Sequence, residues 1–209
     1  MSSATWYFDF VSPFAYIGLH RLGELPAGLA IEYRPVLFAG LLDHWGQKGP
    51  AELPTKRRYT YRFSQWTAAR LGLRFRYPAA HPFNPLPHLR LALACDSAPQ
   101  AVQRIFDSIW TGGHDAADPG RYRALCEALG VGPQKPETAQ IKDALKKNTQ
   151  EAAQRGVFGV PMLDLDGELF WGADAIDFFK AYLADRATLE NDEVRRLDGL
   201  PQGAVRKGS

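Results

Sequence analysis

The sequence predicts an α/β fold in which a long helical segment interrupts a small sheet. Three observations lead to this prediction. The chain opens with a strand, a short helix and a second strand; residues 39–155 show helical periodicity without a strand signal; and the last third returns to two strands and a helix. Because one short crossover helix joins the first two strands, we expect them to be parallel.

The composition is that of a folded protein with no nucleic-acid or membrane partner. Of the 209 residues, 45% are hydrophobic and 12% aromatic, and the formal net charge is only +2. The N-terminus lacks the pattern of a signal peptide, and no apolar run approaches the roughly 20 residues that span a bilayer. We therefore expect a cytoplasmic protein. Cys95 and Cys126 are expected to be small core residues, and no group of side chains has metal-ligand spacing.

The first strand is predicted at residues 6–11 and runs directly into Ser12 and Pro13. Serine is a preferred N-cap, and proline suits the first helical position because it has no N–H to leave unpaired. The Ser12 hydroxyl should thus lie among unpaired N–H groups at the positive end of a helix dipole, where an anion is favoured. Two interpretations stay open: Ser12 only caps the helix, or it also contacts an anionic group.

The middle of the chain reads as loops and helices. A second strand at residues 30–37 contains a proline, which suggests an edge strand, and the glycines and prolines of 39–54 predict a loop with short helical turns. A helix follows at 56–71, with Tyr59, Phe63 and Trp66 as its apolar stripe. The proline-rich segment 77–87 is irregular; it is either a connector or one wall of a pocket.

Further helices are predicted from His88 to Arg155, among them one that begins at the capping pair Asp118-Pro119. Residues 157–165 then predict a strand entered through Gly-Val-Pro, and Asp166-Gly167 predicts a tight hairpin turn to a partner strand at 168–171. Gly172, Ala173 and Asp174 open the closing helix, and a charged tail follows.

This element order is that of a thioredoxin-like fold with a large all-helical insertion after the second strand. Four motifs make the resemblance specific: Phe8-Asp9-Phe10-Val11-Ser12-Pro13-Phe14, His81-Pro82-Phe83-Asn84-Pro85-Leu86, Gly156-Val157-Phe158-Gly159-Val160-Pro161 and Phe170-Trp171-Gly172-Ala173-Asp174. Together they resemble the 2-hydroxychromene-2-carboxylate isomerases, which are similar to kappa-class glutathione transferases and DsbA-type oxidoreductases. The expected parts are a thioredoxin-like domain (1–38 and 156–185), a helical insertion domain (39–155) and a charged C-terminal tail (186–209).

The resemblance implies a glutathione site with Ser12 as the catalytic residue, facing the sulfur. It implies that the main chain of Val160, before a cis Pro161, holds the cysteinyl part of glutathione. The γ-glutamyl end would be received by Trp171, Gly172, Ala173 and Asp174. Taken alone, Asp174 is equally an ordinary helix-capping acid. Many family members have a polar residue in place of Ala173, so one side-chain contact is missing here.

The resemblance also implies that the aromatic substrate lies against the insertion, near Phe83 and Asn84. Asn84 and Lys56 are candidates for contacting the oxygen charge of that substrate. Some relatives carry basic residues where this chain has Gly40, Leu41 and Leu42, so the substrate is not fixed. A homodimer is implied as well.

The chemistry of the residues themselves fits this resemblance. The first helix starts with Ser12-Pro13-Phe14-Ala15 instead of Cys-x-x-Cys, which excludes disulfide exchange within that site. A hydroxyl at a helix N-terminus can still lower the pKa of a bound thiol from about 8.5 toward neutrality. A serine hydrolase is not indicated, because Ser12 has no flanking glycines and no histidine with matching spacing.

The expected activity is therefore a glutathione-dependent isomerase that interconverts 2-hydroxychromene-2-carboxylate and trans-o-hydroxybenzylidenepyruvate in naphthalene-type aromatic catabolism. Two alternatives stay open. A kappa-like glutathione transferase would use the same site but release a stable thioether, and a non-catalytic thioredoxin-like binding module would not bind glutathione.

Overall fold

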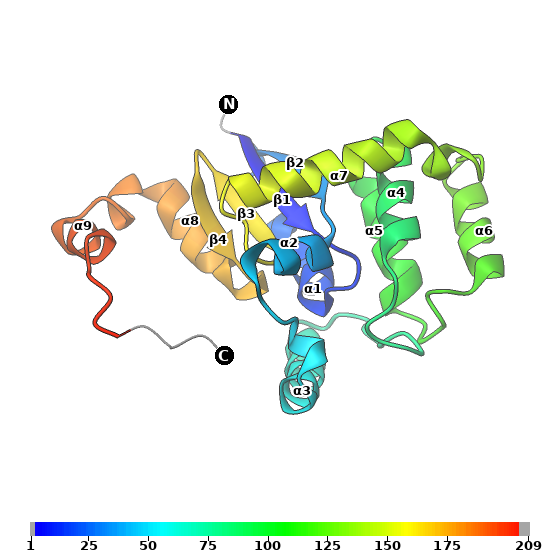
Figure 1. Ribbon diagram of the computed structural model, residues 1–209, viewed down its shortest axis with the longest axis horizontal. Helices are drawn as coiled ribbons and strands as arrows, with labels where there is room; N and C mark the ends of the chain where they lie inside the picture. Colours follow the sequence, from blue (N-terminus) through cyan, green and yellow to red (C-terminus); the bar gives the residue numbers. More distant parts are fainter. Residues whose placement is uncertain (1–2, 205–209) are drawn as a thin grey trace. The chain divides into compact units, whose positions relative to one another are not determined.

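The computed structural model describes residues 3–204 and divides into two compact units, with the boundary in the chain between Ile176 and Asp177. The strands of the first unit are β1 (Ser3–Phe8), β2 (Ala30–Pro35), β3 (Met162–Leu165) and β4 (Glu168–Trp171). Its helices are α1 (Pro13–Arg21), α2 (Phe38–Trp45), α3 (Pro54–Arg70), α4 (Leu86–Ala94), α5 (Pro99–Trp110), α6 (Pro119–Ala128) and α7 (Ala139–Gln154) (Figure 1). α8 (Ile176–Ala184) begins at the boundary, and the second unit also contains α9 (Asp192–Asp198).

The four strands form one mixed sheet in the order β2-β1-β3-β4. β1 and β2 are parallel, as expected, and β3 is antiparallel to both of its neighbours. Asp166 and Gly167 have φ angles of 56° and 99°, which is the backbone that a tight two-residue hairpin needs. Pro35 lies on the edge strand, where its missing N–H costs no ladder hydrogen bond. The predicted α/β order of elements is confirmed.

The alternation of side chains along β1 builds two cores, one on each face of the sheet. Tyr7 faces α2 and α7 in a cluster with Leu41 and Ala152. Trp6 and Phe8 stack at a centroid distance of 4.7 Å on the other face, where Phe106 of α5 lies 5.7 Å from Phe8. The strand that carries the Ser12 turn is thus buried on both sides.

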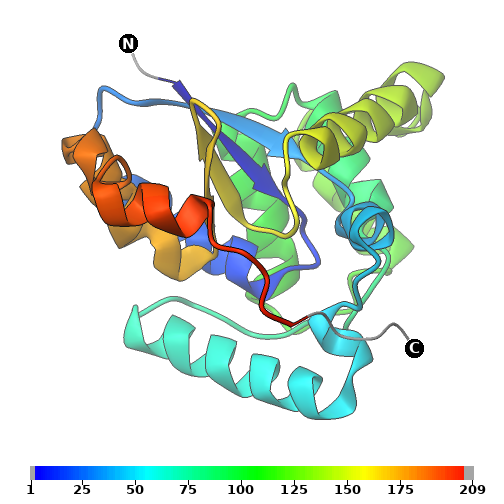
Figure 2. The same ribbon diagram turned by 60° about the vertical axis from the view of Figure 1, so that its left-hand side comes forward.

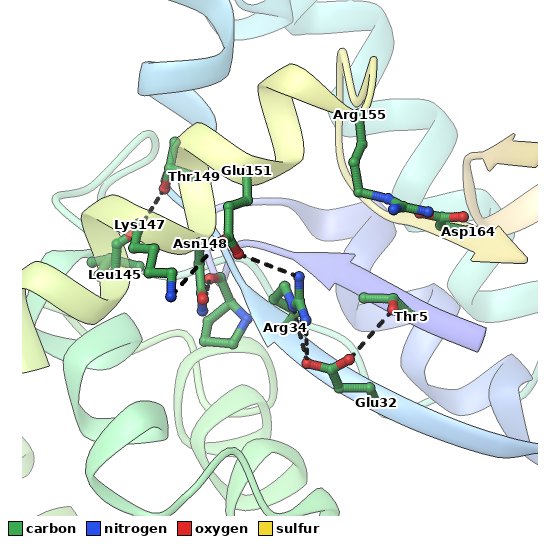
Figure 3. Close-up of polar contacts among 11 residues, drawn as sticks. Thr5, Glu32, Arg34, Leu145, Lys147, Asn148, Thr149, Glu151, Arg155 and Asp164 are labelled. Atoms are coloured by element: carbon green, nitrogen blue, oxygen red, sulfur yellow. Dashed lines mark hydrogen bonds and ion pairs between the residues drawn. The ribbon is translucent and has the colours of Figure 1, made fainter. Parts of the chain in front are cut away.

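Polar contacts tie α7 to the edge of this sheet (Figure 3). Asn148 donates to the carbonyl oxygen of Pro35 at 3.2 Å, and Glu151 lies 3.7 Å from the Arg34 guanidinium. Beyond the end of α7, Arg155 pairs with the buried carboxylate of Asp164 at 2.6 Å. α7 is therefore fixed across β2 from several points along its length.

α2 is a regular helix where the sequence predicted a loop with short turns. Gly40 lies inside the helix without breaking it. A Cβ at this position would meet the Thr149 side chain of α7 at 3.0 Å, so glycine allows the two helices to pack closely. Gly46, at a φ of 61°, forms the left-handed C-cap that ends the helix. The strand predicted at 157–165 is also shorter, because regular pairing begins only at Met162.

α3 packs against α1 but buries few of its own residues (Figure 2). The apolar stripe predicted from the sequence is largely exposed, with Tyr59 and Trp66 at 65% and 54% exposure. Phe63 stacks between them and contacts Phe14 at a centroid distance of 5.9 Å. Within residues 3–204, the structure contains no helix of the length and hydropathy that a membrane span requires.

Candidate active site

A pocket of about 360 Å³ opens where α1 begins, and all of its walls belong to the first unit. Its volume lies in the range of small-ligand sites. Segments that are far apart in the chain meet here: the start of α1, the Pro50 turn, α3, the turn before β3 and the turn after β4. The lining residues are Ser12, Pro13, Phe14, Pro50, Lys56, Tyr59, Thr60, Phe63, Val160, Trp171, Gly172, Ala173 and Asp174.

Ser12 is the N-cap of α1 and also lines this pocket. Its Oγ accepts a hydrogen bond from the Ala15 N–H at 3.2 Å. Its hydroxyl donates to the Val160 carbonyl oxygen over 3.4 Å, which is long for an O–H donor. The helix N–H polarises the hydroxyl, and the weak bond to Val160 leaves its proton available to a better acceptor in the pocket.

Three side chains hold the turn that presents Ser12. The buried Asp9 carboxylate accepts from the Val11 N–H at 3.0 Å. Nε2 of His81 lies 2.8 Å from the Val11 carbonyl oxygen, and the Trp110 indole N–H donates to the Phe10 carbonyl at 3.0 Å. The Val11 N–H and the carbonyl oxygens of Phe10 and Val11 therefore have fixed partners, and these hold the turn before Ser12 in place.

Asp9 is fully buried and has no charged partner among the described residues. Its second oxygen accepts from the Phe38 N–H at the start of α2, at 2.9 Å. Burial raises the pKa of this carboxyl to about 7, although the hydrogen bonds from Val11 and Phe38 oppose the shift. Asp9 thus links the Ser12 turn to α2 and titrates near neutrality.

The buried site of His81 favours its neutral imidazole. Burial lowers its pKa, against the opposing effect of its hydrogen bond to Val11. Because a carbonyl oxygen can only accept, Nε2 carries a hydrogen. The Tyr61 hydroxyl donates to the His81 carbonyl oxygen at 2.8 Å and lies at the same distance from Nδ1. The proline-rich segment is therefore more than a connector, because its His81 side chain holds the backbone of Val11, the residue before Ser12.

Two backbone segments, before β3 and after β4, form another wall of the pocket. The Val160–Pro161 peptide bond is cis, as expected, and the Pro161 carbonyl accepts from the Gly172 N–H at 2.9 Å. Gly172 has a φ of 101° and a ψ of 161°, a conformation reserved for glycine, and a Cβ there would collide with the Asp174 carboxylate. These residues place Asp174 at the pocket, directly before α8.

Lys56 and Asp174 are the two charged residues that line the pocket. Lys56 comes from α3 and Asp174 from the turn after β4. A ligand with one anionic and one cationic group can therefore pair with Lys56 at one point and with Asp174 at another. The remaining lining is mostly apolar or aromatic, which suits the body of an organic molecule.

The structure brings together most of the site residues predicted from the sequence. Pro161 supports the wall through its carbonyl without lining it, and the substrate candidates Phe83 and Asn84 are not among the lining residues. The Asn84 side chain instead accepts from the Leu86 N–H at the start of α4. The aromatic wall is made by Phe14 together with α3.

Six residues line the site although sequence reasoning did not assign them to it: Pro13, Phe14, Pro50, Tyr59, Thr60 and Phe63. Tyr59 and Phe63 are two of them that belong to the predicted apolar stripe. Their signal was present in the stripe at 59, 63 and 66, but periodicity alone cannot separate a core stripe from the wall of a pocket. The basic residues on the rest of the helix were the sequence feature that could have distinguished them.

Comparison with known proteins places this geometry in a family. Residues 5–184 match the model of the DSBA-like thioredoxin domain, which confirms the thioredoxin-like fold. The 2-hydroxychromene-2-carboxylate isomerase of Sphingobium xenophagum is 30% identical over 190 residues, covering 86% of this chain and 97% of that protein. The chain belongs to the 2-hydroxychromene-2-carboxylate isomerase family.

The chain has two further similarities. A solved structure of a 2-hydroxychromene-2-carboxylate isomerase superposes with a TM-score of 0.76 at 23% identity, over 92% of this chain and 98% of the other. Human glutathione S-transferase kappa 1 is 21% identical over 86% of this chain and 90% of its own length. Members of the isomerase family are enzymes, so the interpretation as a non-catalytic binding module is set aside.

Proposed function

We propose that this protein is a glutathione-dependent isomerase that interconverts 2-hydroxychromene-2-carboxylate and trans-o-hydroxybenzylidenepyruvate in aromatic catabolism. The observation that carries the proposal is the Ser12 hydroxyl at the N-terminus of α1, facing a pocket whose lining contains no cysteine. A site built like that of a thiol oxidoreductase, but without its own sulfur, fits a ligand that brings one.

The residues of the pocket fit glutathione by their chemistry. Glutathione has one ammonium group, two carboxylates and a thiol. Asp174 suits the γ-glutamyl ammonium, with Trp171, Gly172 and Ala173 beside it. The main chain of Val160, ahead of the cis bond to Pro161, suits the cysteinyl backbone, and Ser12 lies within hydrogen-bond distance of the Val160 carbonyl.

Bound glutathione would supply a thiolate that adds to the conjugated carbon of the substrate and leaves again after bond rotation. The chain contributes the conditions for this chemistry. Ser12 donates a hydrogen bond to sulfur, and the positive end of α1 favours the ionised thiol. Splitting one high barrier into two lower ones is the gain of a covalent route.

The substrate would use the α3 side of the pocket. Phe14, Tyr59 and Phe63 offer ring faces to an aromatic body, and Lys56 offers a cation to the charge on its pyruvoyl oxygens. This placement favours Tyr59 and Phe63 over Phe83 and Asn84 as the aromatic wall. The resemblance also leads us to propose that the protein is cytoplasmic and forms a homodimer. Sedimentation analysis of the purified protein would test the homodimer.

The decisive experiment measures isomerisation of 2-hydroxychromene-2-carboxylate with and without glutathione. Turnover should depend on glutathione and be absent with S-methylglutathione, which fills the site but has no free thiol. Turnover that is unaffected by removal of glutathione would refute the mechanism.

A kappa-like glutathione transferase is the second candidate, favoured by the similarity to human glutathione S-transferase kappa 1. It predicts a stable thioether product from an electrophile such as 1-chloro-2,4-dinitrobenzene. Product analysis separates the two activities, because an isomerase returns the thiol unchanged and a transferase consumes it.

A further inference from the structure

A second pocket, of about 310 Å³, lies among α2, α4 and α7 and shares no lining residue with the Ser12 site. Each helix contributes one face. α7 supplies residues spaced three or four apart, which places them on the same side of the helix. Leu37, Leu86 and Leu145 give the pocket an apolar wall.

Its polar lining is strongly one-sided. Arg90, Lys142 and Lys146 line the pocket together with His44, and no acidic residue does. The nearby carboxylate of Glu137 is shared, at 3.2 Å from Arg90 and 3.0 Å from Lys142. Three cations therefore have one carboxylate between them, and Lys146 has no ion-pair partner among residues 3–204.

The Arg90 guanidinium has N–H groups that Glu137 does not use. Its side chain is 21% exposed, and Nη1 donates to both oxygens of Glu137. Its Nε is buried and has no hydrogen-bond partner among the described residues. Because this Nε is not accessible, a ligand in the pocket would meet the other N–H groups of the guanidinium, and a carboxylate is the group whose geometry matches them best.

We propose that this pocket binds an organic monocarboxylate with an apolar body. The carboxylate pairs with Arg90 and Lys146, and the body lies against Leu37, Leu86 and Leu145. The site takes a ligand that is independent of the glutathione chemistry at Ser12, so the proposal does not depend on the proposed function.

The test is calorimetric titration of the full chain with octanoate. Saturable binding is expected, and 1-octanol, which has the same body without the charge, should bind far more weakly. Affinity should fall by at least about tenfold in Arg90→Gln and about threefold in Lys146→Gln. Glu137→Gln should tighten binding, because it removes the carboxylate that competes for Arg90, an effect that simple destabilisation cannot produce.

Lys147→Gln is the matched control. Lys147 is the next residue on α7, 73% exposed and paired with Glu151, and it points toward the sheet side of the helix (Figure 3). Its variant should bind octanoate like the wild type, as should Lys56→Gln. Thermal melts confirm that each variant is folded. Absence of saturable binding, unchanged affinity in Lys146→Gln, or loss of binding in Lys56→Gln would overturn the proposal.

Discussion

The Ser12 hydroxyl oxygen accepts the hydrogen bond that caps α1, and the same hydroxyl group lines the pocket. A substitution of Ser12 therefore changes helix capping and site chemistry together. The two effects can be separated by the choice of replacement. Alanine is a poor N-cap, whereas glycine retains most of the capping preference, and both lack the hydroxyl.

We expect Ser12→Ala and Ser12→Gly to reduce glutathione-dependent turnover by a similar factor, on the order of 100-fold. Both should raise the pKa of bound glutathione toward its free value of about 8.5, measured by the ultraviolet absorbance of the thiolate. Asp118→Ala, which removes the N-cap of α6, should lower stability by about 1 kcal/mol and leave turnover unchanged. A wild-type thiol pKa in Ser12→Gly would mean that Ser12 is only a cap.

Asp9 makes stability depend on pH in an unusual direction. Its pKa is raised to about 7 in the folded protein, so folding favours the protonated form. This contribution is fully present below the ordinary pKa of about 4 and is lost as the pH rises through about 7. Asp9→Asn should therefore remove about 2 kcal/mol of the stability difference between about pH 5 and about pH 8.

Urea unfolding of Asp9→Asn and wild type at both pH values measures this effect. The asparagine loses one of the two backbone hydrogen bonds, but that cost is the same at each pH. Asp118→Asn serves as the control, because Asp118 is a partly exposed carboxylate that caps α6 through Gly120 and Arg121. Parallel pH curves for wild type and Asp9→Asn would contradict the prediction.

At the scale of the element, the turn from β4 into α8 contains Gly172, whose positive φ would be strained for any other residue. Gly172→Ala would force a side chain into a φ of 101° and against the Asp174 carboxylate, so we expect lower stability and at least about tenfold weaker glutathione binding. Gly167→Ala is the matched control, because its φ is 99° but a Cβ there meets nothing within 4 Å. Equal glutathione affinity in the two variants, measured by calorimetry, would show that the turn does not shape the site.

Elements with local signals were predictable from the sequence. The Ser12-Pro13 pair marks the start of α1, and Asp166-Gly167 marks the hairpin between β3 and β4. α2 was not predictable from the sequence. Gly40 lies inside this helix where α2 packs against Thr149 of α7, and that contact exists only in the folded chain. The same limit applies to the aromatic wall: the face of α3 that lines a pocket is decided by its packing on α1.

At the scale of the whole molecule, the fold is that of the DSBA-like thioredoxin domain, and the lining of the Ser12 pocket contains no cysteine. The double variant Ser12→Cys, Ala15→Cys restores the Cys-x-x-Cys spacing at the start of α1. We expect oxidised glutathione to oxidise its two new thiols to a disulfide, and we expect the variant to catalyse the reduction of insulin by dithiothreitol. Each single variant should lack this activity, and thiol titration distinguishes the new pair from Cys95 and Cys126. A double variant whose new thiols stay free under oxidised glutathione would contradict this expectation.

The absence of a cysteine from the pocket lining has a further consequence for durability. An enzyme that keeps its nucleophile in its own chain loses a whole protein molecule each time that atom is alkylated or overoxidised. Here the damaged part would be a replaceable tripeptide. Under the proposed function, treatment with iodoacetamide should therefore leave the protein fully competent once fresh glutathione is supplied.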